Sequence, residues 1–268
     1  MLDGIKLKLE GVCKSYANGA HGSQQAVDNV DLEIKSGEFV CIVGPSGCGK
    51  TTLINMILGI EKLTAGRILI DSVPINGVGR DRACVFQENT LFPWLSVREN
   101  VELGLKVKKR RVEGMSKQER RAFVEKYLDK VGLLPYADHR IHQLSGGMKQ
   151  RVSIARALVL ETEILIMDEP FGALDIATKH NMYPELLKIW KESGKTLIFI
   201  THDIEEAVLL AQRVVVMGNA PHSIKKEISI SLPHPRSSED TEIACAVAEI
   251  KSMIADAYAN GDTEGDYE

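Results

Sequence analysis

Short apolar runs that suit buried strands alternate with stretches of helical spacing along most of the chain. Glu38–Val43 and Ile164–Met167 are such runs, and each predicts a buried strand. Thr51–Leu58 has helical spacing, which predicts a helix soon after the first of these strands. Further strands are expected at Lys6–Val12, Val30–Ile34, Gly66–Ile70 and Ala83–Phe86. The pattern indicates an α/β fold that combines a mixed or parallel sheet with an antiparallel β layer.

The middle of the chain is charged and helical from Asn100 to about Arg140. Ser116 and Glu119 have the spacing of a capping box, in which two side chains and two backbone amides pair reciprocally at the start of a helix. The apolar residues that follow share one helical face, and they are Phe123, Val124, Tyr127, Leu128 and Val131. We expect a helical subdomain at about 88–160, inserted in a main domain that spans 1–235.

The strand–helix alternation returns after Asp168. A helix is expected across Ile176–Lys191, but it contains Pro184. Because proline lacks an amide proton and its ring clashes with the preceding turn, the helix should kink or restart near Tyr183.

The C-terminal part separates from the main domain at about residue 235. Glu239–Tyr258 predicts a terminal helix, so residues 236–260 are expected to form a helical extension. Residues 261–268 are acidic and polar, which predicts a disordered tail.

A glycine-rich segment joins the strand Glu38–Val43 to the following helix. Residues 44–52 read Gly-Pro-Ser-Gly-Cys-Gly-Lys-Thr-Thr. A glycine-rich turn in this position directs backbone N–H groups and the positive end of a helix dipole to one point, which makes an anion site. Lys50 should reach the β- and γ-phosphates of a nucleotide, and the Thr51 hydroxyl should bind Mg²⁺. The complete pattern argues against an ordinary glycine-rich turn.

A second strand ends in two acidic residues. Asp168 and Glu169 follow Ile164–Met167, and Pro170 comes next. Adjacent side chains on an extended backbone point to opposite sides, which suggests separate tasks. Asp168 would serve Mg²⁺ through water, and Glu169 would polarise an attacking water as general base. A solvated acidic turn is the alternative, which the apolar run and the proline disfavour.

These motifs, together with Leu144–Arg151 (Leu-Ser-Gly-Gly-Met-Lys-Gln-Arg), resemble the nucleotide-binding subunit of ATP-binding-cassette (ABC) transporters. The resemblance covers about residues 5–235. The matching positions in chain order are Tyr16, Gly44–Thr52, Gln87, Leu144–Gln150, Ile164–Glu169, Gly172–Asp175 and His202. The resemblance implies a P-loop NTPase fold of the ABC type, with ATP and Mg²⁺ as its ligands. It also implies that two chains clamp ATP between them.

The resemblance implies a role for each site residue. Those expected to take part in catalysis are Lys50, Gln87, Glu169 and His202. Those expected to organise Mg²⁺ are Thr51, Gln87 and Asp168. Those expected to contact the nucleotide are Tyr16, Gly44, Pro45, Ser46, Gly47, Cys48, Gly49, Lys50, Thr51, Thr52, Ser145, Gly146, Gly147 and Gln150. Among them, the turn Ser145-Gly146-Gly147 would act on the γ-phosphate held by the other chain.

Simpler interpretations exist for several of these residues. Ser145-Gly146-Gly147 could be no more than a capped helix start. His202 could be polar surface at a strand end before a helix capped by Asp203, with Glu206 completing a capping box. Gln87 could be an ordinary surface residue, and Tyr16 could be a core aromatic instead of a ring that stacks on adenine.

Three segments narrow the resemblance to one group of transporters. Phe86–Val101, Pro170–Asp175 and Thr201–Val208 look like the nitrate/sulfonate/taurine importer ATPases, whose relatives serve bicarbonate, cyanate or pyrimidine precursors. The resemblance implies ATP-driven uptake of a small solute by a homodimer, or by a pair with a paralogous ATPase subunit. Its partners would be integral-membrane permease subunits and, through them, a periplasmic or surface-tethered solute-binding protein. Its place would be peripheral, on the cytoplasmic side of the inner membrane.

Phe92, Pro93 and Trp94 form a large apolar group directly downstream of Gln87. An exposed aromatic loop would indicate a contact surface. Packing inside the helical subdomain is an equal alternative. In the importers that the chain resembles, this region receives a short coupling helix of the membrane subunit.

Composition limits the remaining possibilities. The net charge of −4 argues against nucleic acid as the main partner. The five cysteines lack metal spacing and suggest buried or unpaired thiols in a reducing compartment. The Cys48 thiol is expected to be exposed when nucleotide is absent. We recognise no signal peptide, and no apolar stretch approaches the roughly 18 residues of a membrane span. A non-transport ABC ATPase and a regulatory module with an inactive site stay open as rival functions.

Overall fold

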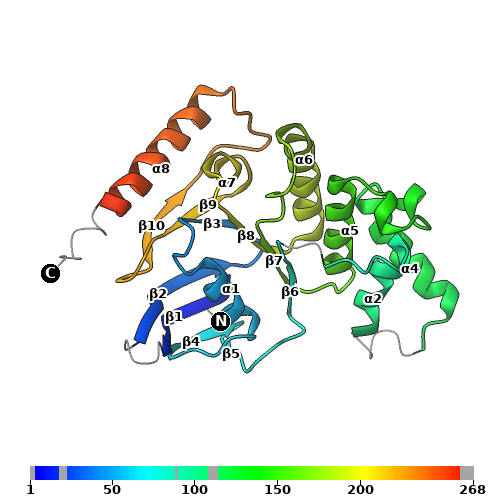
Figure 1. Ribbon diagram of the computed structural model, residues 1–268, viewed down its shortest axis with the longest axis horizontal. Coiled ribbons are helices and arrows are strands. Elements are labelled where there is room, and N and C mark those ends of the chain that lie inside the picture. The colour runs from blue at the N-terminus through cyan, green and yellow to red at the C-terminus, as the bar shows by residue number, and fades with distance from the viewer. Residues whose placement is uncertain (1–3, 18–22, 88–89, 108–113, 260–268) are drawn as a thin grey trace. The chain divides into compact units, whose positions relative to one another are not determined.

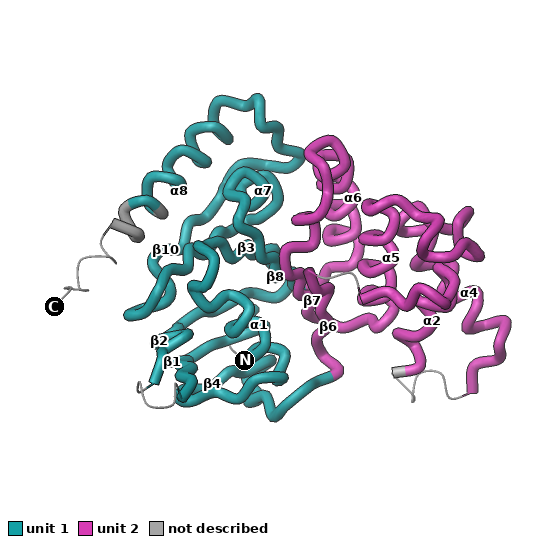
Figure 2. Tube along the Cα trace, in the orientation of Figure 1, with its two compact units in different colours: residues 1–79, 196–268 teal, residues 80–195 magenta. Residues whose placement is uncertain are grey.

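The computed structural model describes residues 4–17, 23–87, 90–107 and 114–259 of the 268. The chain forms two compact units (Figure 2). Unit 1 consists of Met1–Gly79 and Thr196–Glu268, and unit 2 is Arg80–Lys195. The domain boundaries expected from the sequence stay a prediction.

Unit 1 contains the antiparallel layer that the sequence predicts. Four strands lie in the order β2-β1-β4-β5. Their bounds are Ile5–Ala17 for β1, Ser23–Lys35 for β2, Ala65–Ile70 for β4 and Val73–Pro74 for β5. In β1, Leu7 is buried and pairs with Ile34 on one side and Ile70 on the other, so its alternate residues supply the core.

The second sheet of unit 1 is built around β3 (Phe39–Val43), which pairs in parallel with β8 (Thr196–Thr201) and β9 (Arg213–Met217). The antiparallel strand β10 (Ile224–Ser229) pairs with β9. Every residue of β3 and β8 is buried, which explains their continuous apolar sequence. The helices of this unit are α1 (Lys50–Leu58), α7 (Ile204–Leu210) and α8 (Thr241–Ala259), labelled in Figure 1.

Unit 2 joins a pair of parallel strands to a set of helices. Strand β6 (Arg82–Val85) pairs with β7 (Ile164–Asp168). The helices are α2 (Val97–Val107), α4 (Lys117–Lys130), α5 (Gly146–Leu158) and α6 (Ile176–Ser193), with short 3₁₀ turns at Leu134–Tyr136 and Ile141–Gln143. The expected mixture of a parallel sheet, an antiparallel layer and helices is thereby confirmed.

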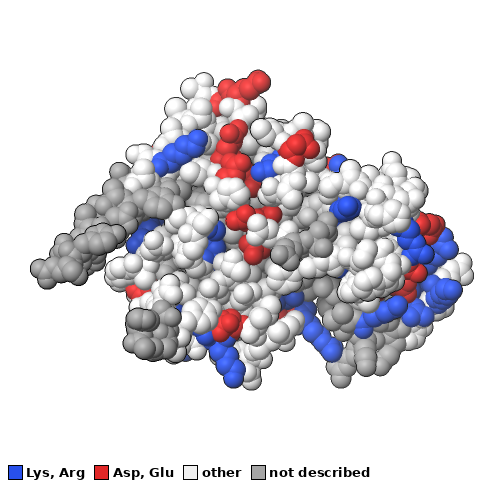
Figure 3. All heavy atoms as spheres, in the orientation of Figure 1, with Lys and Arg blue, Asp and Glu red and all other residues white. Residues whose placement is uncertain are grey.

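Helix α4 begins as the sequence predicts. The Ser116 hydroxyl accepts from the Glu119 amide at 3.2 Å, and the Glu119 carboxylate accepts from the Ser116 amide at 2.7 Å. Val124, Tyr127 and Leu128 are buried on the predicted face. The opposite face is charged: on the side drawn in Figure 3, Lys and Arg lie beside Asp and Glu over the part of unit 2 that carries α4.

Two predictions about helices have clear outcomes. The restart expected near Tyr183 is wrong, because α6 runs unbroken through Pro184 from Ile176 to Ser193. Pro184 itself is exposed, whereas Tyr183 and Leu186 on the inner face are buried, so packing holds the helix together across the missing hydrogen bond. The terminal helix is confirmed as α8. The expected tail at 261–268 lies outside the described residues.

Within the described ranges, none of the helices has both the length and the apolar character that crossing a membrane requires.

Candidate functional site

The glycine-rich loop, residues 44–49, leaves the carboxyl end of β3 in unit 1. Val43 pairs with Thr201 of β8 and Val216 of β9, so the loop begins at the edge where all three strands end. A Cβ on Gly44 would lie 2.4 Å from the carbonyl oxygen of Met217, and one on Gly49 would lie 2.3 Å from that of Ala26. Close backbone approach therefore requires glycine at both ends of the loop.

Lys50 fixes the conformation of this loop. Its Nζ donates to the carbonyl oxygens of Gly44 at 2.7 Å and Pro45 at 2.6 Å, and the side chain is buried. Helix α1 starts at the same residue, and the first amides of a helix have no partner within it. Exposed residues, Ser46, Gly47 and Thr51, surround these amides, and Thr52 is half-buried. The arrangement suits an anion such as a nucleotide phosphate.

Cys48 does not behave as expected. Its side chain is only 2% exposed, so the prediction of an exposed thiol in the absence of nucleotide is wrong. The sulfur lies 3.9 Å from Lys50 Nζ and 3.0 Å from the Cβ position of Gly44, so it fills the inside of the loop. Burial raises the pKa of the Cys48 thiol, against the opposing effect of the Lys50 ammonium.

Tyr16 lies on β1 close to the same loop. It pairs with Gln24 of β2, two residues before Ala26, whose carbonyl contacts Gly49. The side chain is 41% exposed, and Lys14 Nζ lies 4.8 Å from the centre of its ring. Tyr16 is therefore a surface aromatic and not a core residue. Its ring is available to stack on a planar ligand.

His202 is exposed and directly follows Thr201, so strand pairing places it beside the start of the glycine-rich loop. Helix α7 begins two residues later, where the Asp203 carboxylate accepts from the amides of Glu205 at 3.1 Å and Glu206 at 3.3 Å. The Glu206 carboxylate is buried and accepts from the Thr201 hydroxyl, in place of the expected capping box. The segment around His202 is thus tied to both β8 and α7.

The acidic pair lies in unit 2, at the end of β7. Asp168 is 8% exposed, and Glu169 is half-buried with a φ of 42°. The pair is therefore not extended, and the argument from alternating sides is wrong, because the chain turns into the left-handed region at Glu169. Asp168 is buried, and Glu169 is the more exposed of the two.

Gln87 contacts Glu169 within unit 2. Its Nε2 donates to Glu169 Oε2 at 3.3 Å. Parallel pairing of Val85 with Met167 explains this contact, since each residue lies two positions beyond the paired residue. Close by on β6, burial and then the Asp168 carboxylate raise the pKa of the Cys84 thiol to about 12. Gln87 is thus a partner of the acidic pair and not an isolated surface residue.

The Ser-Gly-Gly turn opens α5 in unit 2. Ser145 and Gly146 are exposed, and the Ser145 hydroxyl accepts from the Met148 amide at 3.3 Å. Gly147 is buried, and a Cβ there would lie 2.9 Å from Thr178 Cγ2 of α6. Gln150 is buried one turn further on, and its Nε2 has no hydrogen-bond partner in the part of the chain that the structure describes. The exposed helix start is suited to an anion.

Asp175 belongs to the segments that resemble ABC ATPases, and the sequence assigned it no role of its own. It caps α6, accepting from the Thr178 amide at 2.9 Å and from the Thr178 hydroxyl at 2.7 Å. These hydrogen bonds lower the pKa of the Asp175 carboxyl. The signal that could have found it is Asp three residues before Thr at the start of a helical pattern.

The residues that the resemblance assigns to Mg²⁺ carry oxygen donors. Among the described residues, no cluster of three or more His, Cys, Asp or Glu side chains could hold a metal by itself. Thr51, Gln87 and Asp168 offer a hydroxyl, an amide and a carboxylate oxygen. Such ligands fit Mg²⁺, which keeps several waters and binds with substrate phosphates through few protein groups.

A glycine-rich loop between a buried strand and a helix start, with an acidic residue ending another strand, defines a P-loop nucleotide-binding protein. Residues 27–172 match the ABC transporter family, and the chain belongs to this family. It binds nucleotide and is an ATPase of the ABC type.

Curated relatives match most of the chain. The nitrate import ATP-binding protein NrtD of Synechocystis sp. is 48% identical over 215 residues, which are 80% of this chain and 79% of that protein. The taurine import ATP-binding protein TauB of Yersinia pestis bv. Antiqua is 47% identical over 225 residues, 84% of each.

Solved structures confirm the fold. A dimeric structure of a post-hydrolysis state of the ATP-binding cassette MJ0796, bound to ADP and Pi, has a TM-score of 0.73 and 38% identity, covering 84% of this chain and 98% of that one. The structure of cbiO1 from Clostridium perfringens, part of the ABC transporter complex cbiONQ, has a TM-score of 0.76 and 29% identity, covering 97% and 98%.

Proposed function

We propose that this chain is the ATP-hydrolysing subunit of an ABC importer, in which ATP-driven closure of two subunits drives the uptake of a small solute. The single observation that carries this is the Gln87–Glu169 hydrogen bond beside the buried Asp168. An inactive regulatory module would have no need to hold a general base against a polar amide at a strand end. Similarity to import ATP-binding proteins along four-fifths of the chain supports the transport role.

Each site residue has a distinct task in this proposal. Lys50 and the amides at the start of α1 bind the phosphates. Glu169, half-buried and in contact with Gln87, takes the proton of the attacking water, and His202 contacts the γ-phosphate. Tyr16 stacks on adenine through its exposed ring.

Three oxygen-bearing side chains would hold Mg²⁺: Thr51, Gln87 and Asp168. The ion would neutralise charge on the phosphates when bound. Thr51 is exposed beside the glycine-rich loop, whereas Asp168 is nearly buried, so the two would differ in their freedom to move.

The second nucleotide contact comes from a partner chain. Ser145, Gly146 and Gly147 at the start of α5 would act on the γ-phosphate bound to the other subunit. The Ser145 hydroxyl oxygen accepts from the Met148 amide, so the Ser145 O–H and the amides of Gly146 and Gly147 remain to donate hydrogen bonds to the anion. The partner is a second copy of this chain or a paralogous ATPase subunit.

The solute is a small anion, with nitrate and a sulfonate such as taurine the first candidates. Relatives named for nitrate import and for taurine import are nearly equal in identity to this chain, at 48% and 47%. A pyrimidine precursor, bicarbonate or cyanate is the alternative. The solute is selected by the permease and the solute-binding protein, with which this chain would assemble at the cytoplasmic side of the inner membrane.

The ATPase assignment is tested with Glu169→Gln in the full chain. Loss of the base should lower phosphate release by about 100-fold or more. The variant should also accumulate as an ATP-bound dimer, measured by size-exclusion chromatography with light scattering in Mg·ATP. Glu163→Gln is the matched control, because Glu163 is exposed just before the other end of β7 and should leave both measurements unchanged.

Two results would count against the assignment. A near wild-type rate in Glu169→Gln would show that another group takes the proton. A strictly monomeric Glu169→Gln protein that still binds ATP would rule out the shared site between two chains.

A further inference from the structure

Arg236 lies in the segment that connects β10 to α8 in unit 1. Its guanidinium makes five hydrogen bonds, all to backbone carbonyls. Nη1 donates to Val208 and Ala211, both at 2.6 Å; Nη2 donates to Leu232 at 2.7 Å and Ile230 at 3.2 Å; Nε donates to Leu232 at 3.0 Å. One side chain thus fastens its own segment to the end of α7.

The residues 232–236, here named the strap, complete the carboxyl end of α7. A helix leaves its last carbonyls without partners inside the helix. Arg236 satisfies those of Val208 and Ala211, and His234 Nε2 lies 3.0 Å from that of Leu210. A cation at this end is also favoured by the helix dipole. The strap therefore supplies hydrogen-bond donors to the last carbonyls of α7, a helix of only seven residues that cannot supply these donors itself.

The other end of α7 is tied to the residue beside His202. The Thr201 hydroxyl accepts from the Asp203 amide at 3.0 Å and donates to the Glu206 carboxylate, which is buried on α7. His202 lies between Thr201 and Asp203. A shift of α7 would therefore move the backbone on which His202 is carried.

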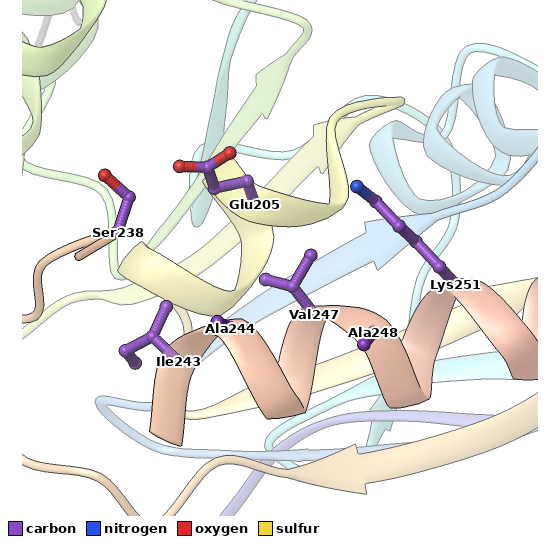
Figure 4. Close-up of a pocket in the computed structure, with 7 residues that line it drawn as sticks. All are labelled: Glu205, Ser238, Ile243, Ala244, Val247, Ala248 and Lys251. Atoms are coloured by element: carbon purple, nitrogen blue, oxygen red, sulfur yellow. The ribbon is translucent and has the colours of Figure 1, made fainter. Parts of the chain in front are cut away.

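Helix α8 covers the outer side of α7. Figure 4 shows Ile243 and Val247 pointing from α8 toward α7, and both are buried. A hollow of about 270 Å³ remains beside them, with Glu205 and Lys251 at its rim. The C-terminal extension is therefore joined to α7 in two ways, by this apolar contact and by the hydrogen bonds of the strap.

We propose that the strap is a positioning element for the γ-phosphate contact of this ATPase, with Arg236 as the positioning residue that holds α7, and through it His202, in place. This rests on the function proposed for His202. The C-terminal extension then has a task in turnover: whatever displaces the strap slows hydrolysis without weakening ATP binding.

The test compares Arg236→Ala with Arg213→Ala in the full chain. Arg213 is a matched control, since it is also partly buried and donates several hydrogen bonds, to Glu38, Glu227 and the carbonyl of Glu33. Among the described residues, none of these hydrogen bonds goes to α7. Arg236→Ala should lower kcat by about tenfold with the KM for ATP unchanged, since a small misplacement of a contact group costs up to about 100-fold. Its α7 amides should exchange hydrogen about tenfold faster.

Arg213→Ala should lose thermal stability yet keep kcat and the α7 exchange rates. Equal kcat losses in both variants, after correction for the folded fraction, would reduce Arg236 to a structural role and overturn the inference. A wild-type kcat in Arg236→Ala would overturn it as well. If Arg236→Ala does not fold, Arg236→Lys decides by the same measurements, because lysine keeps the charge but cannot reach four carbonyls.

His202→Ala separates this inference from the function on which it rests. Wild-type kcat in His202→Ala would refute the role of His202, whatever Arg236 does. Loss of kcat in His202→Ala together with full activity in Arg236→Ala would refute the positioning role alone.

Discussion

Cys48 demonstrates how the inside of the glycine-rich loop is filled. In sequence it lies among glycines, which suggests an accessible thiol. In the folded chain the sulfur packs against Gly44 and near the Lys50 ammonium, and the side chain is buried. Because the thiolate is the reactive form, both burial and the raised pKa protect this cysteine from alkylation.

We expect maleimide to label Cys48 slowly in the nucleotide-free protein at pH 7 and faster as the pH rises. The raised pKa means that the thiolate fraction is small near neutrality and grows with pH. Cys245, which is exposed on α8, serves as the internal control and should be labelled first. Peptide mass spectrometry over time measures both sites. Equal rates at Cys48 and Cys245 would contradict the buried position.

The acidic pair illustrates a local feature that the sequence did not predict. Its residue types were correctly read as the end of a strand. The sequence did not predict the positive φ of Glu169, because this angle depends on how the turn from Pro170 to Gly172 closes. In that turn the Gly172 amide donates to the Glu169 carbonyl at 3.1 Å. This turn sets the direction of the carboxylate.

Helices α5 and α6 meet where the Ser-Gly-Gly turn begins. The resemblance assigns Gly147 to the γ-phosphate held by the other chain, but within its own chain Gly147 also makes room for Thr178. Thr178 is in turn fixed by the Asp175 cap. One glycine thus couples the start of α5 to the start of α6.

Gly147→Ala should destabilise this contact. The added methyl would lie 2.9 Å from Thr178 Cγ2, and overpacking of this kind costs about 1–3 kcal/mol. Alanine has a better helix propensity than glycine by up to about 1 kcal/mol, which offsets part of this cost, so the free energy of unfolding measured in urea should fall by up to about 2 kcal/mol. Adding Thr178→Ser removes the clashing methyl and keeps the hydroxyl, and should restore most of the loss. A double variant no more stable than Gly147→Ala would point to another cause.

Pro184 within α6 shows the limit of a local rule. Proline weakens a helix by removing one hydrogen bond, yet α6 continues because Met182, Tyr183 and Leu186 bury its inner face. Burial on both sides of the proline outweighs the local preference.

At the scale of the whole molecule, unit 2 carries an exposed apolar group, Phe92–Trp94, in addition to the acidic pair. The sequence left open whether Phe92–Trp94 is an exposed loop or packs inside the helical subdomain. Trp94 is 68% exposed, so its side chain is not part of a core. The Phe92 ring lies 5.3 Å from the Trp94 ring in an edge-to-face arrangement. Arg140 donates to the Trp94 carbonyl at 2.6 Å and fixes the loop. An exposed tryptophan suits a contact surface, where this residue is enriched.

Trp94→Ala should weaken binding to the membrane subunit and leave ATP hydrolysis of the isolated chain unchanged. Loss of a central tryptophan costs about 2 kcal/mol or more, which is roughly 30-fold in Kd. Binding would be measured by pull-down with the permease in detergent. Ile60→Ala, which alters another exposed apolar residue, should bind normally. Equal loss of binding and ATPase activity would indicate damage to the fold instead of a contact.

Local patterns were enough to place the glycine-rich loop between a strand and a helix, to end β7 in two carboxylates, and to start α4 at Ser116. Each of these depends on neighbours within a few residues, and the spacing of residue types records them. Only the tertiary structure revealed three other contacts: that of Gln87 with Glu169, 82 positions away, that of Ala26 with Gly49, and the hydrogen bonds of Arg236 to α7. Such contacts are set by strand register and by packing between distant segments, on which no short stretch of sequence carries information.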